Sequence, residues 1–316
     1  MKIESLKIKS KFKNLDNIII DFNTESFMTV IIGRNGSGKS NVIEALVSIF
    51  RNLDLGEAPT FSYEIVYNLE GDGEPKFVKV TADHIQETLS KQYKIKYSSD
   101  NINWTEIAIS KVKRDKEGQS IYLPRHVFAY YSGPSDRLEN YFIKHRSDFY
   151  YKLLKNKLDL KGEMRPLFYA KPIHSQFVLL AFFLNQEDTE GKEFLKEYLG
   201  IESLDSVHFI FRKPDWAKTE NKDDIFWGAE GVVREFLNKL LPHSLAPIKI
   251  DGEEYSGFLS KKHKNEFLHL SIPSAEKLMH VADGLSADKF FKMLESTLLS
   301  ELLSEIRVQV KVKNVD

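Results

Sequence analysis

The first 55 residues alternate between short apolar runs and polar turns. Residues 3–8 place apolar side chains between lysines, and residues 18–22 form a second apolar run. Residues 27–32 are apolar apart from Thr29, which is typical of a strand buried on both faces. Apolar residues then recur at helical spacing over residues 40–53. The pattern therefore predicts three strands, a glycine-rich turn and a helix.

The pattern changes after the predicted helix. Residues 60–127 carry short β-rich runs that are separated by turn clusters such as Gly71-Asp72-Gly73, which favours a small antiparallel lobe. Residues 127–131 return to the pattern of a buried strand and end at Ser132-Gly133-Pro134.

The second half of the chain is predicted to be helical and mixed. Residues 137–200 favour helices with one apolar interruption at residues 167–170. A helix is expected over residues 287–306, and the alternation over residues 308–312 predicts a terminal strand.

Composition restricts the chemistry without revealing the function. The 316 residues include 45 Lys plus Arg and 46 Asp plus Glu, a net charge of −1, and no cysteine. The lack of cysteine excludes disulfides, thiol catalysis and cysteine-ligated metal sites. No apolar run approaches the roughly 20 residues that span a bilayer, and the N-terminus lacks the apolar stretch of a signal peptide. We therefore expect a soluble, cytoplasmic protein that does not associate with membranes.

One motif carries specific chemistry. The eight residues 33–40 fit G-x-x-x-x-G-K-[ST] between a predicted strand and a predicted helix, the context that a phosphate-binding loop requires. Its glycines let backbone N–H groups converge on phosphate oxygens at a helix N-terminus. Lys39 would contact the β- and γ-phosphates, and the Ser40 hydroxyl suits Mg²⁺. The predicted nucleotide-binding residues are Gly33, Arg34, Asn35, Gly36, Ser37, Gly38, Lys39, Ser40 and Asn41.

The sequence around this loop resembles a known family. Residues 33–41, followed by Val42-Ile43-Glu44-Ala45, are similar to the head of the SMC and RecF-type ABC ATPases, and the first hairpin is similar as well. The resemblance implies ATP and Mg²⁺ as cofactors and a head-to-head homodimer that nucleotide clamps together. Residues 128–139 and 174–183 resemble a bacterial subgroup of AAA-type ATPases encoded beside restriction and phage-defence systems.

Three further motifs of that family should be present. The chain contains no run of four apolar residues followed by Asp-Glu, which is the Walker B strand, and Gly284-Leu285-Ser286-Ala287-Asp288 is a poor signature. The C-terminal half of the ATPase core is therefore expected to be missing, either because residues 1–316 are part of a longer ATPase or because the protein is a natural half-head. Without the Walker B glutamate we expect very weak hydrolysis.

Two candidates could fill the glutamine-loop position, which senses the γ-phosphate. Asp136 follows the predicted strand 127–131, and Gln176 follows the apolar run 167–170. Asp136 could instead cap a helix, and Gln176 could be an ordinary residue of a helix N-terminus. Residues 221–224 match the guanine-recognition pattern N-K-x-D but follow a polar run rather than a strand, so ATP is expected to bind at least as well as GTP.

Nucleic acid is a second candidate partner. Residues 141–161 hold six basic side chains interleaved with aromatic ones, a composition that suits phosphate contact and base stacking. An amphipathic helix with solvated lysines explains the same pattern.

These observations predict an α/β P-loop core with an inserted antiparallel β lobe and a helical lobe. The expected division is 1–55 for the P-loop half, 56–126 for the β lobe, 127–136 for a returning core strand and 137–316 for the remainder. The function expected from the resemblance is an ATPase in DNA repair or anti-phage defence. The alternative is a nucleotide-gated module that does not hydrolyse ATP and docks an effector nuclease or a DNA modifier.

Overall fold

The computed structural model divides the chain into two compact units. The first unit comprises residues 1–146 and 164–169, and the second comprises residues 147–163 and 170–316. The structure describes residues 1–22, 25–26, 28–69, 76–114, 119–133, 135–154, 165–184, 189–217, 224–256 and 261–313.

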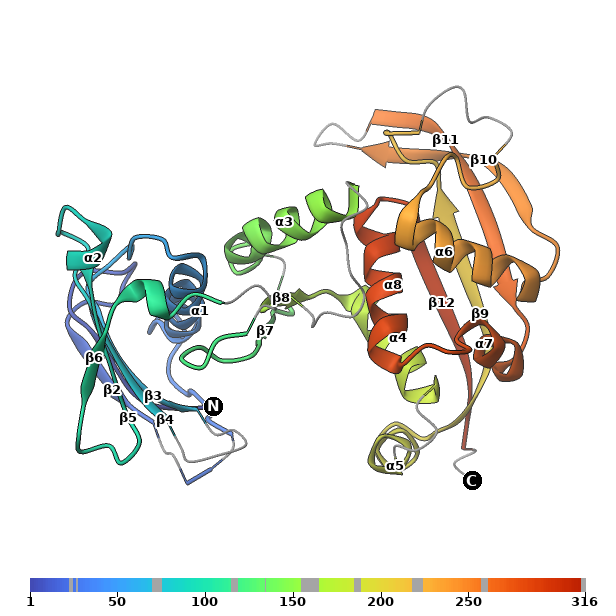
Figure 1. Ribbon diagram of the computed structural model, residues 1–316. Coiled ribbons are helices and arrows are strands. Elements are labelled where there is room, and N and C mark those ends of the chain that lie inside the picture. Colours follow the sequence, from blue (N-terminus) through green and yellow to red (C-terminus); the bar gives the residue numbers. More distant parts are fainter. Residues whose placement is uncertain are drawn as a thin grey trace. The chain divides into compact units, whose positions relative to one another are not determined.

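The first unit is built on one six-stranded antiparallel sheet in the order β2-β1-β3-β4-β5-β6 (Figure 1). Its strands are β1 (Lys2–Ile8), β2 (Ile18–Asp21), β3 (Tyr63–Leu69), β4 (Lys76–Ala82), β5 (Tyr93–Ser98) and β6 (Thr105–Ile107). The predicted first hairpin is confirmed, because β1 pairs antiparallel with β2. The strands expected to form an inserted lobe are antiparallel but not separate, since β3 pairs directly with β1. One continuous sheet therefore replaces the separate core sheet and inserted lobe that the sequence predicted.

Helix α1 (Lys39–Leu55) packs on this sheet (Figure 1). The helix confirms the prediction over residues 40–53. Ala45, Ile49 and Leu53 are spaced four residues apart, so they fall on one face, and they belong to the same buried cluster as Ile65 and Val80 of the sheet. Gly56 ends the helix in the left-handed conformation, with its N–H donating to Asn52 and Leu53 carbonyls.

The segment before the phosphate loop differs from its prediction. Residues 28–33 form no strand, and their apolar side chains are exposed: Met28 is 74% and Ile32 is 87% accessible. Phe27 lies outside the described residues. An apolar run becomes a buried strand only where neighbouring strands satisfy its backbone and cover its side chains. Among the described residues no strand pairs with residues 28–33, so the predicted core strand is not formed here.

The remaining elements of the first unit include a two-stranded sheet, β7 (Val127–Tyr130) with β8 (Leu167–Ala170). The predicted returning strand is thus present, but Phe128 and Tyr130 are exposed rather than buried. The shorter elements are α2 (Leu89–Gln92), η1 (Ile109–Lys111), η2 (Glu139–Phe142) and the first turn of α3 (Ile143–Leu154).

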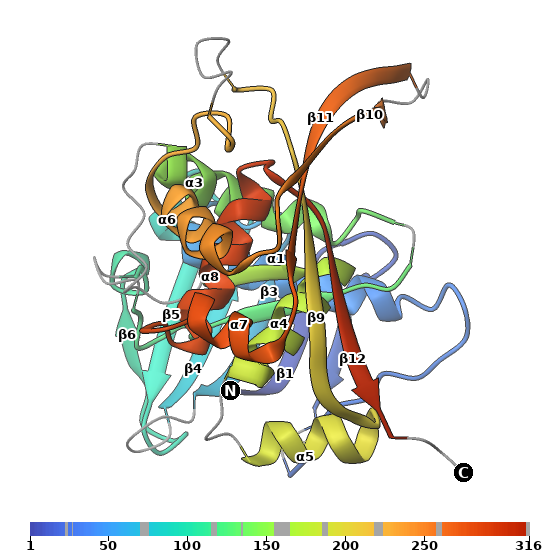
Figure 2. The same ribbon diagram turned by 90° about the vertical axis from the view of Figure 1, so that its right-hand side faces the viewer.

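The second unit has a four-stranded antiparallel sheet in the order β10-β11-β9-β12. Figure 2 shows β9 and β12 side by side over their length. The strands are β9 (Ile201–Arg212), β10 (Ile248–Ser256), β11 (Lys261–Ile272) and β12 (Leu303–Val312), and the helices are α4 (Pro172–Leu184), α5 (Thr189–Tyr198), α6 (Gly231–Leu240), α7 (Ala275–Val281) and α8 (Ala287–Leu299), with η4 (Leu241–His243).

Aromatic contacts hold this core together. The Phe209 ring of β9 meets Phe236 of α6, which meets Phe290 of α8, with centroids 6.4 and 5.7 Å apart. The sequence predicted α8 through residue 306, whereas the helix ends at Leu299. Apolar residues 302–306 pack as the start of β12, because burial on a sheet overrides helical spacing in a short apolar run.

Candidate nucleotide-binding site

The phosphate loop forms a closed turn at the start of α1. The Lys39 ammonium donates to the Gly33 and Arg34 carbonyl oxygens at 2.7 and 2.8 Å. Gly36 and Gly38 have φ angles of 80° and 99°, which glycine adopts without a Cβ penalty. A Cβ at Gly38 would also lie 2.7 Å from a Leu15 methyl carbon. The sequence therefore needs glycine at this position for both its backbone angle and its close neighbour.

A turn between β1 and β2 braces this loop. The Asn14 side-chain amide donates to the Gly36 carbonyl at 2.9 Å, and the Asn41 amide donates to the Asn14 side-chain oxygen. Phe12 and Leu15 exchange two backbone hydrogen bonds, which close the turn. Lys13 has a φ of 58°, an angle that is strained for a residue with a Cβ. This arrangement fixes the tip of the phosphate loop from one side.

A buried carboxylate organises the other side of α1. The Glu44 side chain is only 4% accessible and accepts hydrogen bonds from both Lys13 and Arg137. Arg137 also donates to the Asn41 side-chain oxygen at 2.6 Å. A buried carboxylate requires such partners, since an uncompensated buried charge is very costly. Glu44 lies one helical turn after Ser40, so the two residues share one face of α1.

A cavity of about 70 Å³ opens on that face. Ser40, Glu44, Tyr130, Tyr131 and Arg137 line it, together with Ile43, Ser135 and Leu138. Among the described residues, no group hydrogen-bonds the Ser40 hydroxyl. A water needs roughly 10–15 Å³ of such space, so the cavity has room for several waters or for a group that would replace them.

The residues present fit a bound triphosphate with Mg²⁺. The N-terminus of α1 has no side-chain cap, so its first N–H groups face outward with the positive end of the helix dipole. A Cβ placed on Gly36 would meet nothing within 4 Å, which leaves open space at the loop tip. Phosphate oxygens can replace the two carbonyls that now accept from Lys39. The Ser40 hydroxyl is an oxygen ligand of the type that Mg²⁺ prefers.

A family comparison agrees with this geometry. A family model described as an AAA ATPase domain matches residues 1–223. The chain belongs to the AAA ATPase domain family. AAA ATPase domains bind nucleotide, typically with Mg²⁺, and the matched range includes the whole phosphate loop. No similar protein was found among curated sequences. Among the described residues of this AAA ATPase, no helix is long and apolar enough to cross a bilayer.

The structure places the two predicted γ-phosphate sensors in different units. Asp136 is exposed and lies between Ser135 and Arg137, which both line the cavity. Its backbone carbonyl accepts from Asn140, and its carboxylate does not cap η2. Gln176 is half-buried in α4 of the second unit. Its role as a sensor stays a prediction.

Two residues of segments named in the sequence analysis, His174 and Ser286, have structural roles. The His174 ring accepts from the Lys171 backbone N–H at 2.7 Å through Nδ1, so its Nε2–H donates to Glu295 at 2.8 Å. Ser286, in the weak signature match, caps α8 by accepting from the Lys289 N–H. Both side chains are used locally within the second unit.

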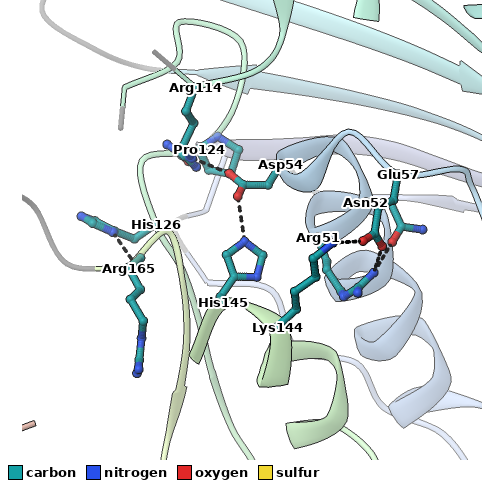
Figure 3. A network of polar contacts seen from close by, with 10 residues as sticks. All are labelled: Arg51, Asn52, Asp54, Glu57, Arg114, Pro124, His126, Lys144, His145 and Arg165. Carbon is teal, nitrogen blue, oxygen red and sulfur yellow. Dashed lines mark hydrogen bonds and ion pairs between the residues drawn. The ribbon is translucent and has the colours of Figure 1, made fainter. Parts of the chain in front are cut away.

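A polar network surrounds the C-terminal end of α1. Figure 3 shows Asp54 between Arg114 and His145. The His145 Nε2 lies 2.7 Å from Asp54, and Arg114 donates to the same carboxylate and to the Pro124 carbonyl. Burial alone would raise the pKa of Asp54, but the hydrogen bond from His145 and the Arg114 charge outweigh it and lower that pKa. The network joins Arg114, Pro124 and the first turn of α3 to the end of α1.

The second part of this network is more exposed. Lys144 and Arg51 both donate to the Glu57 carboxylate (Figure 3). The Lys144 hydrogen bond is the main cause of a lowered pKa at Glu57. Arg146 donates to Glu139. Within the predicted basic segment 141–161, these two basic side chains are paired with carboxylates, while residues 155–161 lie outside the described residues.

Sequence reasoning did not identify four residues of this site: Lys13, Asn14, Glu44 and Arg137. Three of them belong to segments that lack a nucleotide-binding motif of their own. Glu44 was visible only as part of the family resemblance. One signal was available, because a glutamate that lies one helical turn after Ser40 requires a cationic partner if it is buried.

Proposed function

We propose that this AAA ATPase is the nucleotide-binding part of an ABC-type, SMC/RecF-like ATPase that binds MgATP through residues 33–41. The uncapped N-terminus of α1, with Lys39 and Ser40 at its first two positions, is the observation that carries the proposal. It offers backbone donors, a cation and a hydroxyl at one point. Sequence resemblance around the loop supports the subgroup.

Each residue would have a distinct task. Backbone N–H groups at Gly36, Ser37 and Gly38 would surround the phosphates, and the Lys39 ammonium would exchange its carbonyl acceptors for phosphate oxygens. The Ser40 hydroxyl would bind Mg²⁺, which bridges β- and γ-oxygens and neutralises their charge. The hydrogen bond from Asn14 to the Gly36 carbonyl would hold the loop so that its backbone N–H groups point toward the phosphates.

Hydrolysis requires a group that orients the attacking water. Around the cavity, Glu44 is occupied by two cations, and nearby Glu139 is paired with Arg146. Asp136 is exposed and does not line the cavity. We therefore propose that the Walker B carboxylates and the signature come from polypeptide outside these 316 residues, and that this chain alone turns over near background.

The exposed apolar segment supports that proposal. Met28, Val30 and Ile32 lie next to the phosphate loop and are more than half accessible, and Phe128 of β7 is too. Exposed apolar side chains that follow one another along the chain are typical of an interaction site. A strand supplied by further polypeptide would cover these side chains and pair with the backbone of residues 29–32, which belongs to no strand among the described residues.

The biological role is proposed from resemblance. Nucleotide would clamp two complete heads together, and the assembly would act in DNA repair or in anti-phage defence. The same exposed surface favours the alternative, a nucleotide-gated module that docks an effector nuclease or DNA modifier without hydrolysing ATP. ATP turnover in the presence of the polypeptide proposed to carry the Walker B and signature motifs distinguishes the ATPase from the non-hydrolysing module.

Binding is tested by titration calorimetry of ATP with Mg²⁺ into the 316-residue chain. A charge-assisted contact contributes roughly 1.5–3 kcal/mol, so Lys39→Ala is expected to weaken ATP roughly 10- to 150-fold. Lys91→Ala is the matched control, since Lys91 lies exposed on α2, and should bind as the wild type does. An unchanged ATP affinity in Lys39→Ala would contradict the assignment of residues 33–41 as the nucleotide-binding site.

Turnover and assembly are tested together by phosphate release and light scattering. We expect release near background and a monomer at micromolar concentration with or without ATP. Robust turnover that Lys39→Ala abolishes would show that these 316 residues contain a catalytic carboxylate, and Asp136 and Glu139 would be the first to substitute. An ATP-dependent dimer would show that the segment around Ser286 acts as a signature.

A further inference from the structure

We infer that Arg137 reads the terminal phosphate of the bound nucleotide, and that the buried carboxylate of Glu44 holds the guanidinium ready for it. The inference rests on the proposed binding of nucleotide at residues 33–41. It assigns the sensing of the γ-phosphate to an arginine on the loop after β7, in place of the carboxylate of Asp136.

Arg137 is only partly committed to protein contacts. Its Nη2 donates to the Asn41 side-chain oxygen and to Glu44, while 52% of its side chain is accessible. A guanidinium has five N–H donors in a fixed plane. Among the described residues, the other donors of Arg137 have no acceptor. The buried Glu44 and the partly buried Asn41 thus fix the orientation of a guanidinium whose remaining donors stay open.

The Arg137 side chain lines the cavity of about 70 Å³ that Ser40 also lines. The hydroxyl at the Ser40 position of a phosphate loop binds Mg²⁺, which bridges the β- and γ-phosphates. A donor across this cavity from Ser40 is therefore near the last phosphate and distant from the ribose and base.

The local charge favours an anion. The Glu44 carboxylate carries one negative charge and is paired with two cations, Lys13 and Arg137, and Lys39 adds a third positive charge nearby. With the exposed Asp136 carboxylate counted as well, three positive charges against two negative charges leave a surplus of one positive charge. A planar guanidinium also binds phosphate oxygens in a bidentate manner. Asp136, as a carboxylate, offers acceptors only at pH 7 and would repel the phosphate.

Glu44 has a positioning role in this arrangement. It contacts the cations and not the nucleotide, and it lies four residues after Ser40 on α1. Because both Lys13 and Arg137 bind to it, one carboxylate sets the place of two cations. The geometry links the turn after β1 and the loop after β7 to the same helical face.

The test compares ATP with ADP, which lacks the γ-phosphate. Dissociation constants are measured by titration calorimetry with Mg²⁺ for the wild-type chain, Arg137→Ala, Arg137→Lys, Lys39→Ala and, as matched control, Arg146→Ala. Arg146 is also an arginine paired with a glutamate in the first unit, but it does not line the cavity.

The expected pattern is specific to ATP. The wild type should prefer ATP, Arg137→Ala should weaken ATP roughly 10- to 100-fold, and ADP affinity should change less than about threefold. Arg137→Lys keeps a positive charge beside Glu44. It should lose part of the preference for ATP over ADP, because lysine lacks the planar guanidinium. Arg146→Ala should keep the wild-type ratio. Thermal unfolding with each variant confirms that the protein is folded.

Three results would overturn the inference: equal binding of ATP and ADP by the wild type, an unchanged ratio in both Arg137 variants, or equal losses for the two nucleotides. The last result would assign Arg137 a purely structural role through Glu44. Failure of the proposed function gives a different pattern, in which no nucleotide binds to the wild type or Lys39→Ala leaves both affinities unchanged.

Discussion

Asp54 is the residue whose loss should destabilise the first unit most clearly. The side chains of Asp54 and His145 are each 7% accessible, and Arg114 is 11% accessible. Asp54→Asn keeps the size of the side chain and removes its charge, so the buried Arg114 loses its counter-ion. Breaking a buried pair in this way costs roughly 3–5 kcal/mol. We expect the lower end, because Arg114 keeps its hydrogen bond to the Pro124 carbonyl.

The loss should depend on pH with a definite sign. The pKa of Asp54 is lower in the folded protein than its usual value, so the carboxylate stabilises the fold fully above the unfolded pKa of about 3.9. That contribution disappears as the pH falls through the lower, folded pKa. The difference in free energy of unfolding between wild type and Asp54→Asn should therefore be largest near pH 7 and shrink below about pH 4.

Urea denaturation followed by circular dichroism measures this difference at pH 7 and pH 3. Hydrogen exchange read by mass spectrometry should localise the loss to α1 and the first turn of α3. Asp21→Asn is the matched control: it makes the same chemical change at an exposed carboxylate on β2 and should stay within about 0.5 kcal/mol. A loss at Asp54 as small as the control, or one that stays unchanged at acidic pH, would refute the reasoning.

Three further predictions concern glycines, the second core and nucleotide choice. Gly36→Ala should lower the free energy of unfolding by roughly 1–2 kcal/mol from backbone strain alone, and Gly38→Ala by roughly 2–4 because its Cβ also meets a leucine methyl at 2.7 Å; urea denaturation of both variants ranks them. Glu295→Leu leaves the buried Nε2–H of His174 without this acceptor and should cost at least about 1–3 kcal/mol, visible as a lower melting temperature. ATP should bind at least as well as GTP, because the Asp224 carboxylate of the guanine-like motif is bonded to Arg234 and to the Gly228 N–H; a competition that GTP wins tenfold would contradict this.

The sequence alone determined the local chemistry of the phosphate loop. A glycine motif directly before a helical pattern fixes the backbone path, since glycine adopts the positive φ angles at Gly36 and Gly38 without the steric penalty of a Cβ. The helix after it and the first two strands before it followed from hydrophobic spacing, and they are present; the pairing of those strands into a hairpin was implied by the family resemblance. These features depend on interactions between residues that are close in the chain, which a pattern can record.

Tertiary structure alone decided which distant residues complete the site. Arg137 lies 93 positions from Glu44, and Lys13 lies 31 positions from it, so no spacing rule could have paired them. The same limit explains the exposed residues 28–33: their apolar pattern records a need for burial, but it cannot say whether a neighbouring strand is there to meet it. Sheet order is likewise a long-range property, and it joined β3–β6 to β1 where the sequence suggested two bodies. Pairing between distant segments depends on where the whole chain places them, and a local pattern does not contain that information.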